Sequence, residues 1–182
     1  MKALRLRTGI TMVAAALAMI ASSAGLLTAT PAVVRADPAT PIADDLAPLQ
    51  EFRTSGDAGW FYTLKAAEAE NAVNQNKFTK SADIGYLHTT EGTGRTAVHR
   101  LRVKDNGPSY MLSVSANEIG DPRFVDEGII GYVDGSKQTG ETNLLRFSNH
   151  GKWRVLADGP DNVKNMQAAG YDVDGPIGWF KP

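Results

Sequence analysis

The chain has 182 residues, of which 42% are hydrophobic and 21% are charged, and this length fits one domain. The balance is typical of a soluble globular protein and excludes a disordered tail or a multi-span membrane protein. Cysteine is absent, which excludes disulfides, thiolate metal sites and cysteine nucleophiles. Residues 1–36 carry four basic side chains and no acidic one, whereas the rest of the chain carries 15 basic and 20 acidic side chains. A mildly acidic body argues against a nucleic-acid partner.

The first 36 residues have the features of a secretory signal peptide. A basic start contains Lys2, Arg5 and Arg7. An apolar stretch at 10–27 follows, and small residues around Arg35 supply a cleavage site. We therefore expect cleavage after Ala36 and a secreted, extracellular protein without membrane contact. The alternative is a transmembrane anchor, because the apolar stretch approaches the roughly 20 residues that span a bilayer.

Residues 37–47 are expected to form an extended leader, because they contain prolines and no hydrophobic periodicity. A tetrapeptide of Ile-Gly, an aromatic residue and an apolar residue then occurs three times, at 84–87, 130–133 and 177–180. Since a fixed spacing indicates repeated structural units, we divide the domain at 48–182 into units 48–94, 95–140 and 141–182.

Each unit is expected to begin with two strands. In the first unit they lie at 49–53 and 60–64, and a helix at 65–76 follows, with Ala66, Ala69 and Val73 on one face. In the second unit they lie at 98–102 and 109–113, and Gly and Pro reduce the following segment, 115–122, to a turn. In the third unit they lie at 144–148 and 152–156, before a helix from Asp161 to Gly170. Two further strands, of which the second contains the tetrapeptide, are expected to close each unit.

These units predict an all-β fold with short helices, a β-trefoil of three units of about 47 residues. A lone unit of this size cannot bury its apolar face, whereas three units around a pseudo-threefold axis can close into a barrel. Closure would also remove free strand edges. A three-bladed propeller-like array is the competing architecture, and it is disfavoured because propellers typically have four or more blades.

Three segments also resemble a known family. They are GDAGWFYT at 56–63, EGIIGY at 127–132 and GYDVDGPIGW at 170–179. They are similar to a bacterial secreted repeat family of unknown function, with Gly-Asp-His-Phe-Tyr-Thr and Glu-Gly-x-x-Gly-Tyr segments. The resemblance covers residues 48–180 and implies a lectin-like β-trefoil that in other proteins sits beside secreted hydrolases. The family's histidine is replaced by Trp60, Ser109 and Lys152.

Aromatic residues suggest a binding site in the first unit. Side chains alternate along a strand, and aligning Phe61 with Tyr110 and Trp153 marks these three as a buried column. Trp60 and Tyr62 are then expected to face outward, where with Asp57 they would offer a sugar an apolar plate and a carboxylate. The alternative interpretation packs Trp60 beneath the helix at 65–76.

The aromatic residues of the three tetrapeptides, in contrast, are expected to belong to the core. They are Tyr86, Tyr132 and Trp179. An aromatic residue that recurs in every unit of a closed barrel is usually there for packing.

No catalytic motif, metal site or cofactor is expected. The histidines are isolated in the sequence, at His88, His99 and His150. Neighbouring carboxylates are interpreted as turn residues, namely Asp126 with Glu127 and Asp172 with Asp174. An enzyme would require carboxylates of different units to converge in space.

The sequence thus favours a secreted, noncatalytic binding module for carbohydrate or cell-envelope glycan, with Asp57, Trp60 and Tyr62 as its site. The alternative is a secreted protease inhibitor or other protein-partner module. Such a module would present an exposed loop, for which Lys104-Asp105-Asn106-Gly107-Pro108 is the best candidate.

Overall fold

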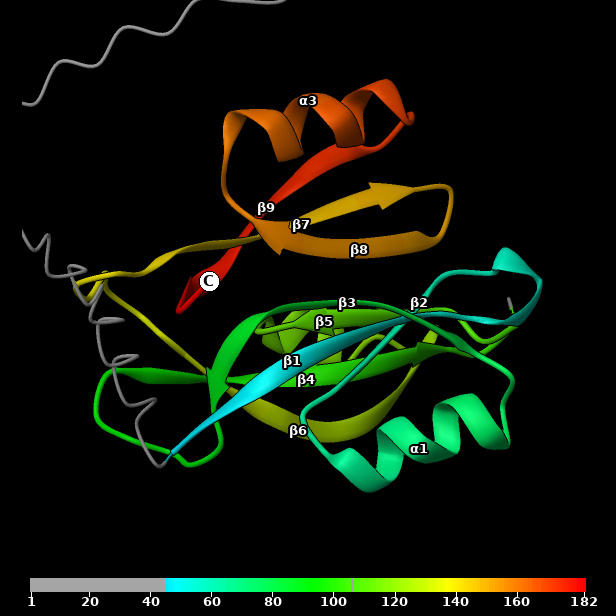
Figure 1. Ribbon diagram of the computed structural model, residues 1–182, viewed down its shortest axis with the longest axis horizontal. Coiled ribbons are helices and arrows are strands. Elements are labelled where there is room, and N and C mark those ends of the chain that lie inside the picture. The colour runs from blue at the N-terminus through cyan, green and yellow to red at the C-terminus, as the bar shows by residue number, and fades with distance from the viewer. Residues whose placement is uncertain (1–44, 106) are drawn as a thin grey trace, which may run out of the picture. The chain divides into compact units, whose positions relative to one another are not determined.

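A computed structural model (Figure 1) describes residues 45–105 and 107–182. The expected signal peptide and residues 37–44 of the expected leader lie outside these ranges. Most of the described residues form strands, so the chain belongs to the all-β class with short helices. The first strand begins at Leu46, inside the segment that was expected to be an extended leader. The described residues include no helix that is long and apolar enough to cross a membrane.

The elements form three successive groups of the same order: strand, strand, helix, strand. The first group is β1 (Leu46–Arg53), a short 3-10 turn η1 (Ser55–Asp57), β2 (Trp60–Thr63), α1 (Ala66–Asn74) and β3 (Thr79–His88). The second is β4 (Arg95–Val103), β5 (Tyr110–Ser113), α2 (Ala116–Ile119) and β6 (Phe124–Asp134). The third is β7 (Thr142–Asn149), β8 (Lys152–Ala157), α3 (Pro160–Ala168) and β9 (Asp172–Phe180). In each group the first strand pairs antiparallel with both the second and the third.

The closing part of each group differs from the expectation of two strands. A single long strand runs through it, and two register shifts bend this strand along its partner in every group. Bulges of this kind change the direction of a strand without ending it. The segment expected as a turn in the second group contains the single helical turn α2.

One open sheet contains all nine strands of the described residues, with the order β2-β1-β3-β6-β9-β7-β8. Off this path, β4 pairs with β6, and β5 pairs with β4. The hydrogen-bonded ladder therefore does not itself form the expected closed barrel. Between groups, β3 meets β6 at one residue pair, β6 meets β9 at one pair, and an isolated bridge joins Tyr86 to Lys181.

The tetrapeptide glycines allow the third strands to approach one another closely. A Cβ atom on Gly85 would collide with the carbonyl oxygen of Lys181, and one on Gly178 would collide with the side chain of Val133. Gly131 similarly faces the carbonyl oxygen of His88. Glycine is used where backbones must come this close. The repeated Ile-Gly pair therefore marks the contacts between groups.

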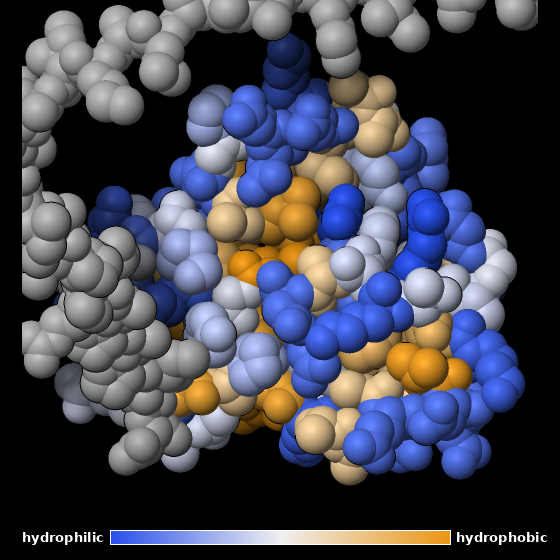
Figure 2. Space-filling model, viewed as in Figure 1, coloured by the Kyte–Doolittle hydropathy of each residue, from blue (hydrophilic) through white to orange (hydrophobic). Residues whose placement is uncertain are grey.

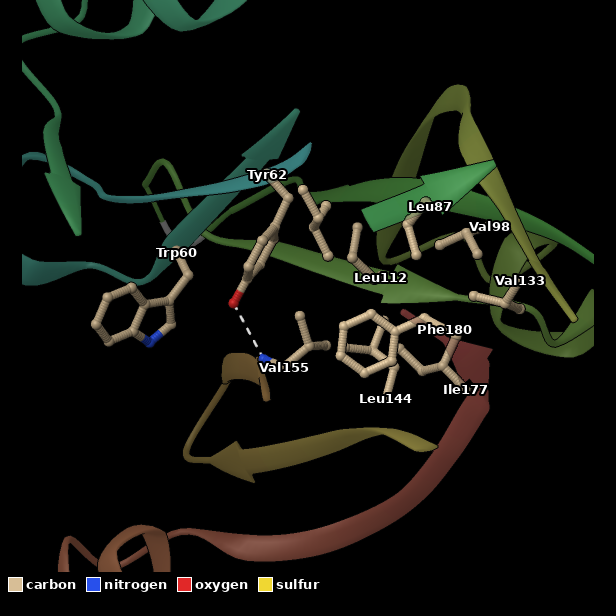
Figure 3. Close-up of a cluster of buried hydrophobic side chains, with 11 residues drawn as sticks. Trp60, Tyr62, Leu87, Val98, Leu112, Val133, Leu144, Val155, Ile177 and Phe180 are labelled. Carbon is tan, nitrogen blue, oxygen red and sulfur yellow. Dashed lines mark hydrogen bonds between the residues drawn. The ribbon is translucent and has the colours of Figure 1, made fainter. Parts of the chain in front are cut away.

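The main hydrophobic core lies between the groups (Figure 3). It combines buried side chains from first, second and third strands: Leu49, Val98 and Leu144; Tyr62, Leu112 and Val155; and Leu87, Val133 and Phe180. Three smaller clusters each contain side chains from a helix and the strands it covers. In Figure 1, α1 and α3 lie on opposite outer sides of the strands.

Strand β2 is buried on both faces, which corrects the expectation that Trp60 and Tyr62 face outward. Phe61 packs in the cluster beneath α1, whereas Trp60 and Tyr62 belong to the main core. Trp60 therefore does not pack beneath α1 either. The side chains do alternate as expected, but the second face points to the other groups instead of to solvent.

The expected buried column also requires correction. Phe61 pairs with Phe52, whereas Tyr110 pairs with Arg102 and Trp153 pairs with Ser148. Tyr110 and Trp153 therefore occupy the same ladder position as Trp60, whereas Phe61 lies one position further along, and Trp153 is only partly buried. Of the three tetrapeptide isoleucines, Ile177 is buried, and the other two, Ile84 and Ile130, are partly buried against the same core.

Polar links join the groups in a cyclic pattern. Arg100 of β4 donates to Glu68 of α1 and to the carbonyl oxygen of Tyr62. Arg146 of β7 donates to Glu118 of α2 and to the carbonyl oxygen of Leu112. The first and third groups are linked by Glu51 of β1, which accepts two hydrogen bonds from Arg154 of β8. One charged residue at the same position of each first strand, namely Glu51, Arg100 or Arg146, thus links its group to one neighbouring group.

Candidate functional site

A pocket with a mixed polar and aromatic wall lies where β3, β6 and β9 end and where the first strands begin. Its volume is about 440 Å³, within the usual range for small-molecule sites. It lies at the end of the chain marked C in Figure 1, because Lys181 is part of its wall. We call it the axial pocket. Its wall comprises Leu46, Tyr86, His88, Thr93, Arg95, Tyr132, Asp134, Gln138, Thr139, Glu141, Trp179, Phe180 and Lys181.

Three aromatic side chains, one from each third strand, line the axial pocket. They are Tyr86, Tyr132 and Trp179, and all three are partly exposed. The expectation that they belong to the core is therefore wrong. The next residue of each tetrapeptide is the buried one: Leu87, Val133 and Phe180 are at most 2% exposed. Since neighbouring residues of a strand face opposite sides, the aromatic rings point away from the core.

Polar residues occupy the position two residues after each aromatic ring. His88, Asp134 and Lys181 therefore lie on the same strand face as the rings. The paired first strands add Leu46 opposite His88 and Arg95 opposite Asp134. Equivalent positions of the three groups thus place an imidazole, a carboxylate and an amine around the pocket.

His88 lies between two carboxylates at the pocket wall. Its Nδ1 atom is 3.0 Å from Oδ2 of Asp45, and its Nε2 atom is 3.1 Å from Oδ2 of Asp134. The side chains of His88 and Asp134 are 15% and 14% exposed, so both are shielded from solvent but reach the pocket. This arrangement fixes the orientation of the imidazole ring.

Asp45, which precedes β1, also binds Arg95. The Nη1 atom of Arg95 is 2.7 Å from Oδ2 of Asp45, and Nε of Arg95 is 3.9 Å from Oδ1 of Asp134. Partial burial alone would raise the pKa of Asp45, but the hydrogen bonds and charges of Arg95 and His88 lower it overall. Asp45 is therefore held ionised beside the imidazole.

Glu141 completes the polar wall just before β7. Its Oε2 atom accepts a hydrogen bond of 2.8 Å from the backbone N–H of Gln138. Partial burial and the adjacent Asp134 carboxyl raise the pKa of Glu141, because both disfavour its charged form. Sequence reasoning missed His88, Asp134 and Glu141 because they lie far apart in the chain.

The predicted residues Asp57, Trp60 and Tyr62 do not form an open site. Tyr62 is fully buried, and its hydroxyl donates to Glu51 and accepts from the backbone N–H of Val155 (Figure 3). Trp60 is 8% exposed. Asp57 lies at the surface, where it pairs with Arg53. The aromatic plate that the prediction requires is therefore inside the protein.

The other residues singled out in the sequence have structural partners or lie at the surface. The carboxylates predicted to lie in turns, Asp126 with Glu127 and Asp172 with Asp174, lie instead in the strands β6 and β9. Asp126 faces His99 and accepts a hydrogen bond from the N–H of Gly128. Asp174 binds Arg146 and Ser148. In the loop at 104–108, Lys104, Asp105 and Gly107 are exposed, and Asn106 lies outside the described residues. Figure 2 shows hydrophilic and hydrophobic residues interspersed over one face of the molecule.

These features define an all-β domain whose three groups of strands surround a pocket lined by aromatic and charged residues. Residues 48–181 match the domain of unknown function DUF5648, and the chain therefore belongs to this family. Searches among curated proteins and among solved structures gave no match.

Proposed function

We propose that this chain is a secreted, noncatalytic module that binds carbohydrate, such as a cell-envelope glycan, in the axial pocket. The proposal keeps the function expected from the sequence and moves the site from Asp57, Trp60 and Tyr62. The observation that carries it is the convergence of three partly exposed aromatic rings and several charged groups on one pocket.

The chemistry of the pocket suits a sugar ring. The C–H face of a pyranose is apolar and packs against aromatic rings, which combine a large apolar surface with a polar edge. Its hydroxyls need donors and acceptors around the rim, and Arg95, Asp134 and Glu141 supply both. Ligand sites generally combine apolar walls with a few placed polar groups.

We also propose that the three groups are the units of a β-trefoil around a pseudo-threefold axis. Two observations support this. The third strands contact one another in the cyclic order β3, β6, β9, β3 through single residue pairs. The charged links of Arg100, Arg146 and Glu51 also follow a cyclic order. The axial pocket would then lie on the axis.

Secretion remains part of the proposal and rests on the basic start, apolar stretch and cleavage site of residues 1–36. Sequencing the N-terminus of the protein in the culture medium tests it. We expect a mature chain that begins at Asp37. A membrane-bound protein that still begins at Met1 would identify an anchor instead.

A panel of soluble oligosaccharides and envelope polysaccharides tests the proposed binding. We expect Trp179→Ala to weaken binding of the best ligand by about thirtyfold, because one aromatic anchor commonly contributes ~2 kcal/mol. Asp134→Asn tests the polar wall. Lys164→Ala, on the exposed face of α3, is the control and should bind like the parent.

Melting temperatures of the same variants show that each remains folded. If folded Trp179→Ala and Asp134→Asn proteins bind the ligand as well as the parent, the axial pocket is not the site. The exposed loop at 104–108, with its protein-partner function, would then become the better hypothesis.

A catalytic role has one observation in its favour. Asp134 and Glu141 lie in different units and converge in the pocket, which is the condition that an enzyme would require. Paired carboxyl groups can hydrolyse glycosidic bonds. We expect no reducing ends to be released when the protein is incubated with its ligand, and release that Glu141→Gln abolishes would establish an enzyme.

A further inference from the structure

We propose that the axial pocket binds one divalent transition-metal ion of the zinc type through His88, Asp134 and Glu141. One potential ligand atom of each side chain lies within 4.8 Å of the other two. Among the described residues, this is the one group of three such side chains that is close enough to share an ion. Its members come from the end of β3, the end of β6 and the residue before β7.

His88 is oriented as a metal ligand. Its Nδ1 atom lies 3.0 Å from Oδ2 of Asp45, and the tautomer with its proton on Nδ1 donates to this carboxylate. In that tautomer Nε2 carries a free lone pair, and an ion bound between Nε2 and Oδ2 of Asp134, which lie 3.1 Å apart, would be coordinated by both atoms. Metal-binding histidines usually donate their other N–H to a carboxylate or carbonyl in this way. Asp45 would therefore act as a positioning residue.

The charges around His88 favour a cation. Three carboxyl groups lie near its ring, those of Asp45, Asp134 and Glu141, and Arg95 contacts the first two of them. The nearest contact of Arg95 is to Asp45 at 2.7 Å, whereas its distance to Asp134 is 3.9 Å. A divalent ion between Asp134 and Glu141 would replace repulsion between two carboxylates with attraction to both.

The ligand set indicates the class of ion. Imidazole nitrogen with carboxylate oxygen suits zinc and similar transition metals, whereas calcium and magnesium prefer oxygen ligands alone. Three protein ligands also leave one position of a tetrahedral ion open towards the pocket. The inference does not rest on glycan binding, because the ion can be measured on the protein alone.

Zinc titration tests the inference. It uses the protein as the cell produces it, after a chelator has removed any bound metal. Calorimetry and metal analysis after dialysis should both give one zinc ion per chain. His88→Gln and Glu141→Gln should each weaken zinc binding by about tenfold or more, and Asp45→Asn by roughly 10- to 100-fold. The absorption spectrum of the cobalt-substituted protein should report four-coordinate geometry in the parent.

His99→Gln is the matched control. His99 also faces a carboxylate, with its Nδ1 atom 3.0 Å from Asp126, but within the described residues it belongs to no group of three ligands. The variant should bind zinc like the parent. Circular dichroism checks the folding of every variant, and Glu141→Gln decides the outcome if His88→Gln does not fold.

Three results would overturn the inference. They are the absence of stoichiometric zinc binding, zinc binding that survives both Glu141→Gln and His88→Gln, and a preference for calcium over zinc. Because none of these measurements involves a sugar, failure here leaves the glycan proposal standing, and failure of the glycan proposal leaves the metal site standing.

Discussion

Tyr62 connects the first and third groups through its hydroxyl. The hydroxyl donates to Glu51 at 3.3 Å and accepts a hydrogen bond of 3.1 Å from the N–H of Val155. Burial and the adjacent Glu51 raise the pKa of Tyr62 well above its ordinary value, so the hydroxyl stays protonated. A residue predicted to bind sugar is therefore a buried structural link.

The first prediction concerns this hydroxyl. Tyr62→Phe should lower the free energy of unfolding by about 1–3 kcal/mol, because the N–H of Val155 and the carboxylate of Glu51 each lose a buried partner. Urea denaturation measures the change. Tyr171→Phe, at a partly exposed tyrosine, is the control and should change stability by no more than about 0.5 kcal/mol. Equal stability of the parent and Tyr62→Phe would contradict this role.

The second prediction concerns Trp60. Trp60→Ala should cost about 3–5 kcal/mol of unfolding free energy, as for other buried aromatic truncations. The ring lies in the main core and beneath the guanidinium of Arg154, 4.2 Å from the ring centroid. Trp153→Ala should cost less, because Trp153 is only partly buried. A Trp60→Ala protein as stable as the parent that no longer binds glycan would instead restore the site expected from the sequence.

At the scale of elements, arginines of first strands bind the preceding helices. Arg146 reaches Glu118 at 2.6 Å, and Arg100 reaches Glu68 at 2.9 Å. The hydrogen bond from Arg146 lowers the pKa of Glu118 against the opposing effect of burial. For Glu68, burial alone would raise the pKa, but Thr63 and Arg100 lower it overall.

The third prediction follows from these two lowered pKa values. A carboxyl whose pKa is lower in the folded state stabilises the protein above its unfolded pKa, near 4.5, and loses this effect as pH falls through the folded value. Urea midpoints should therefore decrease below about pH 4.5. Glu118→Gln should make the decrease shallower. An unchanged slope in this variant would show that the Arg146 pair does not contribute.

The fourth prediction concerns the link between Glu51 and Arg154, which are 103 residues apart in the chain. Glu51 is fully buried, so Arg154→Met would leave a buried carboxylate without its cation and should cost about 3–5 kcal/mol. The control is Arg53→Met, because Arg53 and Asp57 form an exposed pair that should contribute less than about 1 kcal/mol. Similar costs for the two variants would argue against a structural role for the buried link.

For the whole molecule, the β-rich class, the first two strands of each group and the nine-residue helices α1 and α3 could be predicted from the sequence. These features could be predicted because the spacing of apolar residues and the positions of glycines depend only on nearby residues in the chain. The burial of the second face of β2 depends instead on the packing of groups that are far apart in the chain. Trp60 and Tyr62 were therefore predicted to face solvent, whereas they lie in the core between the groups.

The candidate site was missed for a related reason, although a local signal existed. Each tetrapeptide aromatic is followed two residues later by a polar side chain on the same strand face, at His88, Asp134 and Lys181. That combination indicates an open face instead of a core. The convergence of Glu141 with His88 and Asp134 has no such local signal, because it arises where the groups meet.

The most direct test of the central claim uses the three tryptophans of the chain. Their indole N–H signals in a proton–nitrogen NMR spectrum can be assigned with single substitutions of Trp60, Trp153 and Trp179. During titration with the glycan that binds best, we expect the Trp179 signal to shift and the Trp60 and Trp153 signals to stay in place. A shift of the Trp60 signal without movement of Trp179 would contradict the axial pocket as the binding site.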